Sequence, residues 1–295
     1  MAKAQHLALG SIAIGIVVLA LKTAAWAATG SSGLFADAAE TVVNVAASVL
    51  TLLAVRLAAE PADANHPYGH DKAEFFAAII EGALIVAAAV LIGVQAWGSL
   101  RHPAPLEALR TGVVLNAVST LINLGWAQLL RVRGRSLRSA SLQADAAHLM
   151  ADVVTSLAVL CGVGLVLLTG QAWLDPAVAV LAACYVLWSG VAVIRGSVGG
   201  LMDAAPASEI VARIRTIVGE QAQGAIEAHD LRTRHAGRLT FLEFHLVVPG
   251  NMSVAAAHDI CDRIETALKA EMAELMITIH VEPEGKAKHH GVVVL

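Results

Sequence analysis

Two short stretches place polar side chains at helical spacing inside long apolar runs. In ADAAHLMADVVTS, His148 and Asp152 are four residues apart, and in ADAAETVVNVAAS, Glu40 and Asn44 have the same spacing. Side chains four residues apart lie on one face of a helix, one turn from each other. Ionisable groups are costly inside a hydrocarbon layer and by default mark an ion or proton pathway. Two helices with such pairs could therefore supply four ligands to one metal ion.

Histidines and carboxylates also gather outside the apolar runs. The stretch PADANHPYGHDKAEF contains Asp63, His66 and His70 within eight residues, which is metal-ligand spacing on a loop. Histidines within strands are more often packed or surface groups than ligands. A dense set with a carboxylate beside the last histidine makes a metal site about as plausible as that simpler reading. The C-terminal part contains such a set: His229, His245, His258, His280 and Glu282.

The composition is that of a membrane protein. Of 295 residues, 57% are hydrophobic and only 15% are charged, with a mean hydropathy of +0.68. Soluble domains have roughly a quarter charged residues, so most of this chain is expected to be solvated by lipid. The formal charge of −4 excludes a strongly basic nucleic-acid-binding protein. Cys161, Cys184 and Cys261 form no CxxC pair and are interpreted as packing residues.

Six segments are long enough to cross a bilayer, which needs about 20 apolar residues. The second and fifth segments carry the polar pairs. The N-terminal sequence MAKAQH leads into apolar residues without a convincing cleavage site, which favours a retained first span over a signal peptide. The predicted spans are residues 7–28, 33–57, 75–98, 108–130, 140–168 and 174–196.

The short loops predict the orientation of these spans. Residues 131–138 contain four arginines and the turn at 170–173 contains none, so the arginine loop is expected in the cytoplasm. Both termini are then cytoplasmic, and the second and fifth spans run antiparallel. At about 1.5 Å per residue, the two polar pairs lie about 10–14 Å from opposite faces. In a hydrocarbon core about 30 Å thick, they can meet near the midplane.

The composition changes after Met202, where charged residues and histidines become frequent. Periodicity predicts a helix, two strands joined by an Ala-Gly turn, a helix capped by Ser253, and a third strand. This αββαβ order is typical of a two-layer α+β domain. The predicted organisation is a six-helix transmembrane domain at 1–202, a cytoplasmic domain at 203–284 and a mobile tail at 285–295.

These motifs resemble those of the cation diffusion facilitator family, bacterial six-span transporters that exchange divalent metal for protons. The resemblance rests on the polar pair of the second span, PADxNHxxGHxKAE, HxxxD in the fifth span, HDLRTR and IHxEP. It implies a secondary transporter, not an enzyme, that is a homodimer in the cytoplasmic (inner) membrane. It also implies a cytoplasmic domain similar to a small metallochaperone, and charge contacts of Lys72 and Asp203 near the dimer seam.

The resemblance implies three kinds of metal site. The transport site would use Glu40, Asn44, His148 and Asp152. A loop site would use Asp63, His66 and His70. A binuclear site in the cytoplasmic domain would use His229, His245, His258, His280 and Glu282.

The second-span pair departs from the family pattern, in which Asp or His is commonly followed by Asp. Here the pair is Glu40 and Asn44, so the ligands would be an imidazole, an amide oxygen and two carboxylates. The formal charge of about −2 still balances a divalent cation, and zinc accepts N and O ligands. Zinc is therefore the expected substrate and regulatory ligand. Manganese, iron, cobalt and cadmium stay open, because the set is harder than a His/Asp-rich one.

An antiport mechanism follows from the ligand types. An unperturbed histidine titrates near pH 6.5, and only deprotonated ligands bind metal, so protonation of His148 can expel the ion. The sequence contains no GxxxxGK[ST] motif that would suggest nucleotide use. An intramembrane metalloenzyme would typically carry HExxH, which is absent. A transport-degenerate metal-binding scaffold acting through its cytoplasmic domain stays open because of Asn44.

Further carboxylates in the predicted spans include Asp37, Asp145 and Glu81. Asp37 and Asp145 each precede a polar pair by about one turn. Each could belong to a proton path, but capping or hydrating the wet end of its helix is the favoured interpretation. For Glu81, a proton-linked role and pairing with a neighbouring helix are equally plausible.

Overall fold

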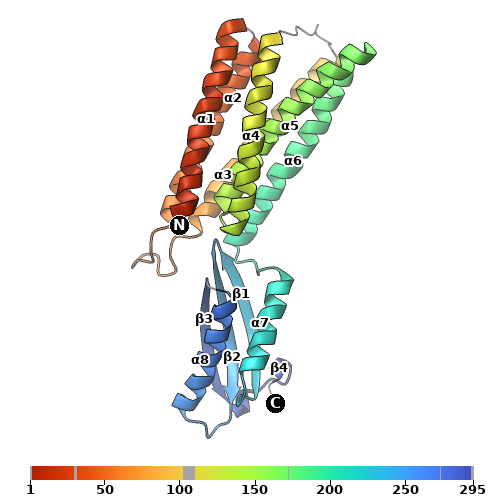
Figure 1. Ribbon diagram of the computed structural model, residues 1–295. Helices are drawn as coiled ribbons and strands as arrows, with labels where there is room; N and C mark the ends of the chain where they lie inside the picture. The colour runs from red at the N-terminus through yellow and green to blue at the C-terminus, as the bar shows by residue number, and fades with distance from the viewer. Residues whose placement is uncertain (1, 30–31, 102–109, 172, 273, 294–295) are drawn as a thin grey trace. The chain divides into compact units, whose positions relative to one another are not determined.

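The computed structural model describes residues 2–29, 32–101, 110–171, 173–272 and 274–293. The side chains of Asp37, Glu40 and Asn116 also lie outside the described part of the chain. The chain divides into two compact units, Met1–Val198 and Gly199–Leu295. Figure 1 shows the first as a bundle of long helices and the second as a small sheet with helices.

The first unit consists of long apolar helices. At 27 to 30 residues each, these helices are about 40–45 Å long, enough to cross a bilayer. Within the described residues, α1, α2, α3 and α6 each contain a segment long and apolar enough to do so. The helices are α1 (Ala2–Thr29), α2 (Ser32–Ala58), α3 (Ala73–Arg101), α4 (Arg110–Ser136), α5 (Ala140–Thr169) and α6 (Leu174–Leu201).

The predicted boundary between the fourth span and the arginine loop, at residue 130, is wrong. Helix α4 continues to Ser136, so Arg131, Arg133 and Arg135 lie in its last turns rather than in a loop. Arginine is a good helix former, and cations near a helix C-terminus interact favourably with the helix dipole. The connection to α5 is correspondingly short.

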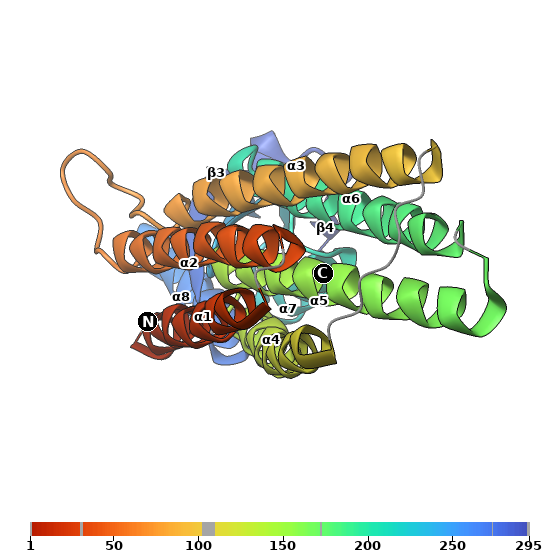
Figure 2. The same ribbon diagram turned by 90° about the horizontal axis from the view of Figure 1, so that it is seen from above.

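Helices α1, α2, α4 and α5 share one core. Buried side chains from all four meet there, including Ala8, Val55, Leu130 and Leu142. Figure 2 shows α3 and α6 side by side at the edge of this group. Their approach depends on small residues, because a Cβ atom at Gly190 would lie 3.0 Å from the side chain of Ile85. Small residues at helix contacts are typical of membrane proteins.

The start of α5 is fixed to α3 by a buried carboxylate. Ser139 caps α5, and its hydroxyl accepts the N–H of Leu142 at 3.3 Å. Glu74 of α3 accepts a hydrogen bond from the Ser139 hydroxyl. It also accepts the backbone N–H of Ser141 at 3.2 Å and its hydroxyl at 3.0 Å. A carboxylate at a helix N-terminus is favourable, so Glu74 holds the helix that carries His148 and Asp152.

The second unit is a two-layer α+β structure. The four-stranded sheet has the order β3-β2-β1-β4, with β2 and β3 parallel and the other pairs antiparallel. Its elements are α7 (Ser208–Gln221), β1 (Glu227–Ala236), β2 (Leu239–Val248), α8 (Val254–Glu271), β3 (Leu275–Pro283), η1 (Glu284–Lys286) and β4 (Val292–Val293).

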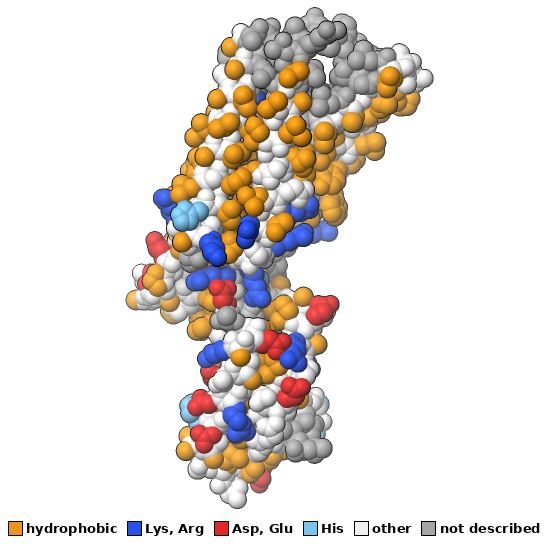
Figure 3. Space-filling model, in the orientation of Figure 1, with side chains coloured by type: hydrophobic (Ala, Val, Ile, Leu, Met, Phe, Trp, Pro, Cys, Tyr) orange, Lys and Arg blue, Asp and Glu red, His pale blue; other side chains and the backbone are white. Residues whose placement is uncertain are grey.

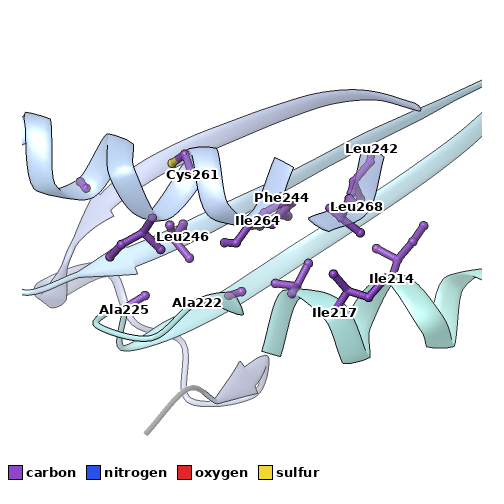
Figure 4. Packing of buried hydrophobic residues seen from close by; sticks show 14 of the residues in the cluster. Ile214, Ile217, Ala222, Ala225, Leu242, Phe244, Leu246, Cys261, Ile264 and Leu268 are labelled. Atoms are coloured by element: carbon purple, nitrogen blue, oxygen red, sulfur yellow. The ribbon is translucent and has the colours of Figure 1, made fainter. Parts of the chain in front are cut away.

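Helices α7 and α8 cover one face of this sheet. Leu242, Phe244 and Leu246 alternate along β2 and pack against Ile217 of α7 and Ile264 of α8 (Figure 4). Since successive strand residues face opposite sides, His245, between Phe244 and Leu246, lies on the other face, as do its register partners His229 and His280. The fold therefore separates an apolar face from a face that is available for polar chemistry.

The predicted αββαβ order is confirmed, including the Ser253 cap, whose hydroxyl accepts the N–H of Ala256 at 3.2 Å. The prediction of a mobile tail is wrong, since β4 pairs with β1. Cys261 is buried as predicted. The packing interpretation is wrong for Cys161 and Cys184, which are exposed on the apolar helices α5 and α6. A thiol is apolar enough for such a surface.

Candidate metal sites

The membrane-unit cluster joins α2 to α5 through one amide. The Asn44 side chain donates a hydrogen bond to Asp152 and contacts the Nε2 atom of His148 through its Oδ1 atom, at 2.6 Å. The three side chains are 5–7% exposed. Three of the four residues predicted for the transport site therefore lie together. The fourth, Glu40, belongs to α2, but its side chain lies outside the described residues.

A second contact between the same helices sets their direction. The Ser48 hydroxyl donates to Oδ1 of Asp145 at 3.3 Å. Moving from Asn44 to Ser48 along α2 therefore corresponds to moving backwards from Asp152 to Asp145 along α5. The two helices run antiparallel, as the predicted topology requires.

Asp145 and Glu81 are buried carboxylates. Asp145 is 1% exposed, so its favoured interpretation as a hydrated helix end is wrong. Glu81 is fully buried and accepts a hydrogen bond from Thr51 of α2, which confirms that it pairs with a neighbouring helix. One oxygen of each carboxylate is buried without a hydrogen-bond partner. The helical core thus carries acidic groups beyond the predicted quartet.

The loop between α2 and α3 brings Asp63, His66 and His70 together. The Asp63 carboxylate accepts the backbone N–H groups of Asn65 at 2.8 Å and His66 at 2.6 Å. These bonds, with that of His66 the strongest influence, hold the pKa of Asp63 below its ordinary value. Its two oxygens lie 3.2 Å from Nδ1 of His66 and 3.6 Å from Nε2 of His70. One ligand atom from each residue lies within 4.8 Å of the others, a spacing that fits one cation.

The sheet of the second unit aligns three histidines in one row. Strand register pairs His229 with His245 and His245 with His280, and neighbouring ring centres are 5.3 Å and 5.0 Å apart. The Glu282 carboxylate lies 3.3–3.7 Å from a nitrogen of each ring. These residues are distant in sequence, and the sheet register brings them together.

The donors of this row fit a metal ion. Both ring nitrogens of His229 and Nδ1 of His245 are buried without a hydrogen-bond partner. Buried polar atoms are normally satisfied, so unpaired imidazole nitrogens facing a carboxylate indicate a ligand. Neutral imidazole and carboxylate donors suit zinc and other first-row metals.

The predicted ligand His258 does not join this row. It lies on α8, which belongs to the layer on the other face of the sheet, and it is 72% exposed. Its Nε2 atom is 3.6 Å from Asp262, one helical turn away. Asp203 pairs with Arg234 at 3.2 Å within the second unit.

Sequence reasoning missed Asp230. A single ligand atom from each of Asp230, His229 and His245 lies within 4.8 Å of the others. Simple alternation would point Asp230 away from His229, but a β-bulge follows His229 and Asp230 has a φ of 52°. The Lys288 ammonium pairs with Asp230, and this hydrogen bond is the main cause that lowers the pKa of Asp230. The motif HDLRTR contains this aspartate, which was the available signal.

A buried donor cluster in a bundle of apolar helices, together with a histidine row in a separate unit, defines a membrane protein that handles metal cations. Comparison with known families agrees over most of the chain. The family models described as the cation efflux transmembrane domain and the cation efflux protein cytoplasmic domain match residues 8–202 and 206–284. The chain belongs to the cation efflux family, also called the cation diffusion facilitators, and is a membrane-embedded cation efflux transporter.

Relatives match over nearly the full length. The chain is 40% identical over 281 residues to the uncharacterized transporter sll1263 of Synechocystis, covering 95% of this chain and 90% of the relative. It is 33% identical over 274 residues to the cation-efflux pump FieF of Shewanella oneidensis, covering 92% of each. Part of the chain is also similar to the metal-bound C-terminal domain of the CzcD transporter from Thermotoga maritima. That match has 28% identity and a TM-score of 0.26, and covers 28% of this chain and 99% of the other.

Proposed function

We propose that this transporter exports zinc in exchange for protons, using Glu40, Asn44, His148 and Asp152 as its transport site. The observation that carries the proposal is the amide of Asn44 between His148 and Asp152. The set combines one imidazole nitrogen with oxygen donors, which zinc accepts and which manganese, iron, cobalt and cadmium can share.

The amide contact links metal binding to a proton. An ionised Asp152 can only accept hydrogen bonds, so the Asn44 amide nitrogen must face it. The Asn44 oxygen then faces His148, and an oxygen acceptor requires that Nε2 of His148 carries a hydrogen. A metal ion that binds Nε2 must displace this hydrogen. If His148 is an imidazolium, with hydrogen on both ring nitrogens, metal entry at Nε2 releases one proton, whereas a neutral ring only moves its hydrogen to Nδ1.

The charge distribution of the helical unit supports a cytoplasmic location of its N-terminus. The starts of α1 and α3 and the ends of α2, α4 and α6 share one end of the bundle, where Lys and Arg gather in Figure 3. Cytoplasmic segments of membrane proteins carry an excess of such residues. The residues at this end are Lys3, Arg56, Lys72, Arg131, Arg133, Arg135, Arg138 and Arg195.

We place the protein in the bacterial cytoplasmic membrane as a homodimer, as the family resemblance implies. Under this proposal, residues 1–202 form the six-span domain and 203–284 the cytoplasmic domain. The loop set Asp63, His66 and His70 would bind a second metal ion. The row of His229, His245 and His280 with Glu282 would bind regulatory metal, and His258 stays a predicted ligand of that domain.

Zinc flux into proteoliposomes tests the transport proposal. Wild-type protein is expected to accumulate zinc when a pH gradient of the opposite direction is imposed. Asp152→Asn removes a charged ligand without changing its size, and is expected to lower the flux at least about tenfold. The matched control is Asp259→Asn on the exposed surface of α8, which should keep wild-type flux.

The proposal would be contradicted if the protein bound zinc but transported none of the metals zinc, manganese, iron, cobalt and cadmium. That result would favour the alternative of a transport-degenerate scaffold, for which Asn44 in place of a carboxylate is the motivating feature. Restored flux in Asn44→Asp would then assign the loss to this position.

A further inference from the structure

The segment Lys288–Val293, here called the strap, is bound to β1 beside the histidine row. Strand β4 pairs with β1 at Glu227 and Ala228. Glu227 is 2% exposed, and its two oxygens accept four consecutive backbone N–H groups of the strap, those of residues 288 to 291, at 3.0–3.3 Å. Burial by itself raises the pKa of Glu227, but these N–H groups outweigh it and hold the pKa below its ordinary value.

A glycine allows the strap to lie directly against the candidate ligands. A Cβ atom at Gly291 would lie 2.9 Å from the Cβ atom of His229 and would collide with the carbonyl oxygen of Ala228. Any other residue would therefore force the strap away from β1. By contrast, a Cβ atom at Gly285 would meet open space.

The strap also places a lysine ammonium group next to the candidate metal ligands. The Lys288 ammonium pairs with Oδ2 of Asp230. The same carboxylate has a ligand atom within 4.8 Å of donors from His229 and His245. The bulge that turns Asp230 toward these rings holds it at a φ of 52°, a conformation that aspartate tolerates better than most residues.

We propose that Asp230 is a metal ligand and that the Lys288 ammonium competes with the metal for its carboxylate, so that the strap responds to metal binding. This inference rests on the proposed metal binding by the cytoplasmic unit. A divalent cation bound by His229, His245 and Asp230 would repel the ammonium on the same carboxylate. Lys288 would leave, and the strap would keep its Glu227 anchor and the β4–β1 pairing but lose its ion pair with β1.

Hydrogen–deuterium exchange of the full-length protein in detergent, with and without zinc, tests this. Peptides from β2 and β3 report whether zinc binds the histidine row, and peptides covering 285–293 report the strap. In wild type, zinc is expected to slow exchange in β2 and β3. Exchange in the strap is expected to rise about twofold to fivefold, the range that corresponds to losing an exposed ion pair.

Two variants separate the ammonium from the rest of the strap. Lys288→Met keeps the length of the side chain without its charge, and should raise zinc affinity at the row about twofold to fivefold. Gly291→Ala displaces the strap without removing a ligand and should have the same effect. Lys286→Met and Gly285→Ala are the matched controls and should behave like wild type. Asp230→Asn, which tolerates the same backbone, should weaken zinc binding about tenfold or more.

The outcomes separate the two claims. If zinc slows exchange in β2 and β3 but leaves the strap unchanged, and Lys288→Met binds zinc as wild type does, this inference is wrong while metal binding stands. If zinc changes neither region, metal binding by the histidine row is wrong as well. Zinc flux through the membrane unit is measured independently of both.

Discussion

Replacing Asn44 by leucine removes the amide that connects His148 to Asp152 while nearly preserving its volume. Both hydrogen bonds of the amide are lost in a buried site. At about 1–3 kcal/mol for each of the two buried polar partners, we expect a destabilisation of about 2–6 kcal/mol. Thermal unfolding in detergent should shift down on the order of 10 °C. Zinc flux should fall at least about tenfold, because leucine offers no ligand atom.

Asn44→Asp provides the opposite test at the same position. The added carboxylate faces Asp152, so the metal-free protein should be less stable than wild type, and zinc should restore its stability. The zinc concentration for half-maximal flux should fall roughly tenfold, which corresponds to about 1.4 kcal/mol. Two unit charges 4 Å apart near a protein surface interact by about 4 kcal/mol, which is enough to account for this change. Vesicle flux is the appropriate assay because it reports movement across the membrane, whereas zinc binding would also report the loop set and the histidine row.

The matched control is Asn123→Leu, which makes the same change at a buried asparagine of α4. It should leave the zinc dependence of flux unchanged. Wild-type stability and wild-type flux in Asn44→Leu would refute the reasoning, because they would show that the amide neither holds the cluster nor contacts the ion.

Three further predictions concern the supports of the sites. Glu74→Ala leaves the start of α5 without its carboxylate partner and should lower stability by about 1–3 kcal/mol, measured by thermal unfolding in detergent. Gly190→Val should separate α3 from α6 and lower both stability and flux, whereas Gly93→Val, where a Cβ atom meets open space, should not. The Arg213 guanidinium hydrogen-bonds Glu271 at 2.7 and 2.8 Å and lowers the pKa of that carboxyl. This pair should therefore stabilise the second unit above the unfolded-state pKa and lose that effect as pH falls through the folded-state pKa, so Glu271→Gln should lower the unfolding temperature more at pH 7 than at pH 3.

The contact between α2 and α5 could be predicted from the sequence because the spacing of polar residues within each helix assigns them to one face. The i, i+4 pairs predicted which faces of α2 and α5 carry ligands, and the antiparallel topology predicted that His148 and Asn44 could meet. In each case the periodicity of one element is enough to assign a face.

Other features depend on backbone geometry that periodicity does not encode. Asp230 joins His229 only because a bulge with a positive φ breaks the alternation. The strap escaped prediction because Glu227 binds it through backbone N–H groups, which are the same for every sequence. The run GVVVL after two histidines was the available signal, since glycine before β-branched residues is compatible with a short strand.

The interpretation of Asp145 as a hydrated helix end is wrong for a related reason. Asp145 lies near the start of α5 and was interpreted as hydrated, but the neighbouring helices bury it. Burial of a helix end depends on how far adjacent helices extend, which one helix's own sequence does not show.

Proton movement driven by zinc in proteoliposomes without an imposed pH gradient tests most directly whether metal and proton exchange at His148. Adding zinc to one side of vesicles containing wild-type protein is expected to release protons to that side, and His148→Ala is expected to abolish this signal. The control is His6→Ala, at an exposed position of α1, which should behave as wild type. Zinc uptake without proton movement, or unchanged proton release in His148→Ala, would contradict the claim that metal and proton exchange at His148.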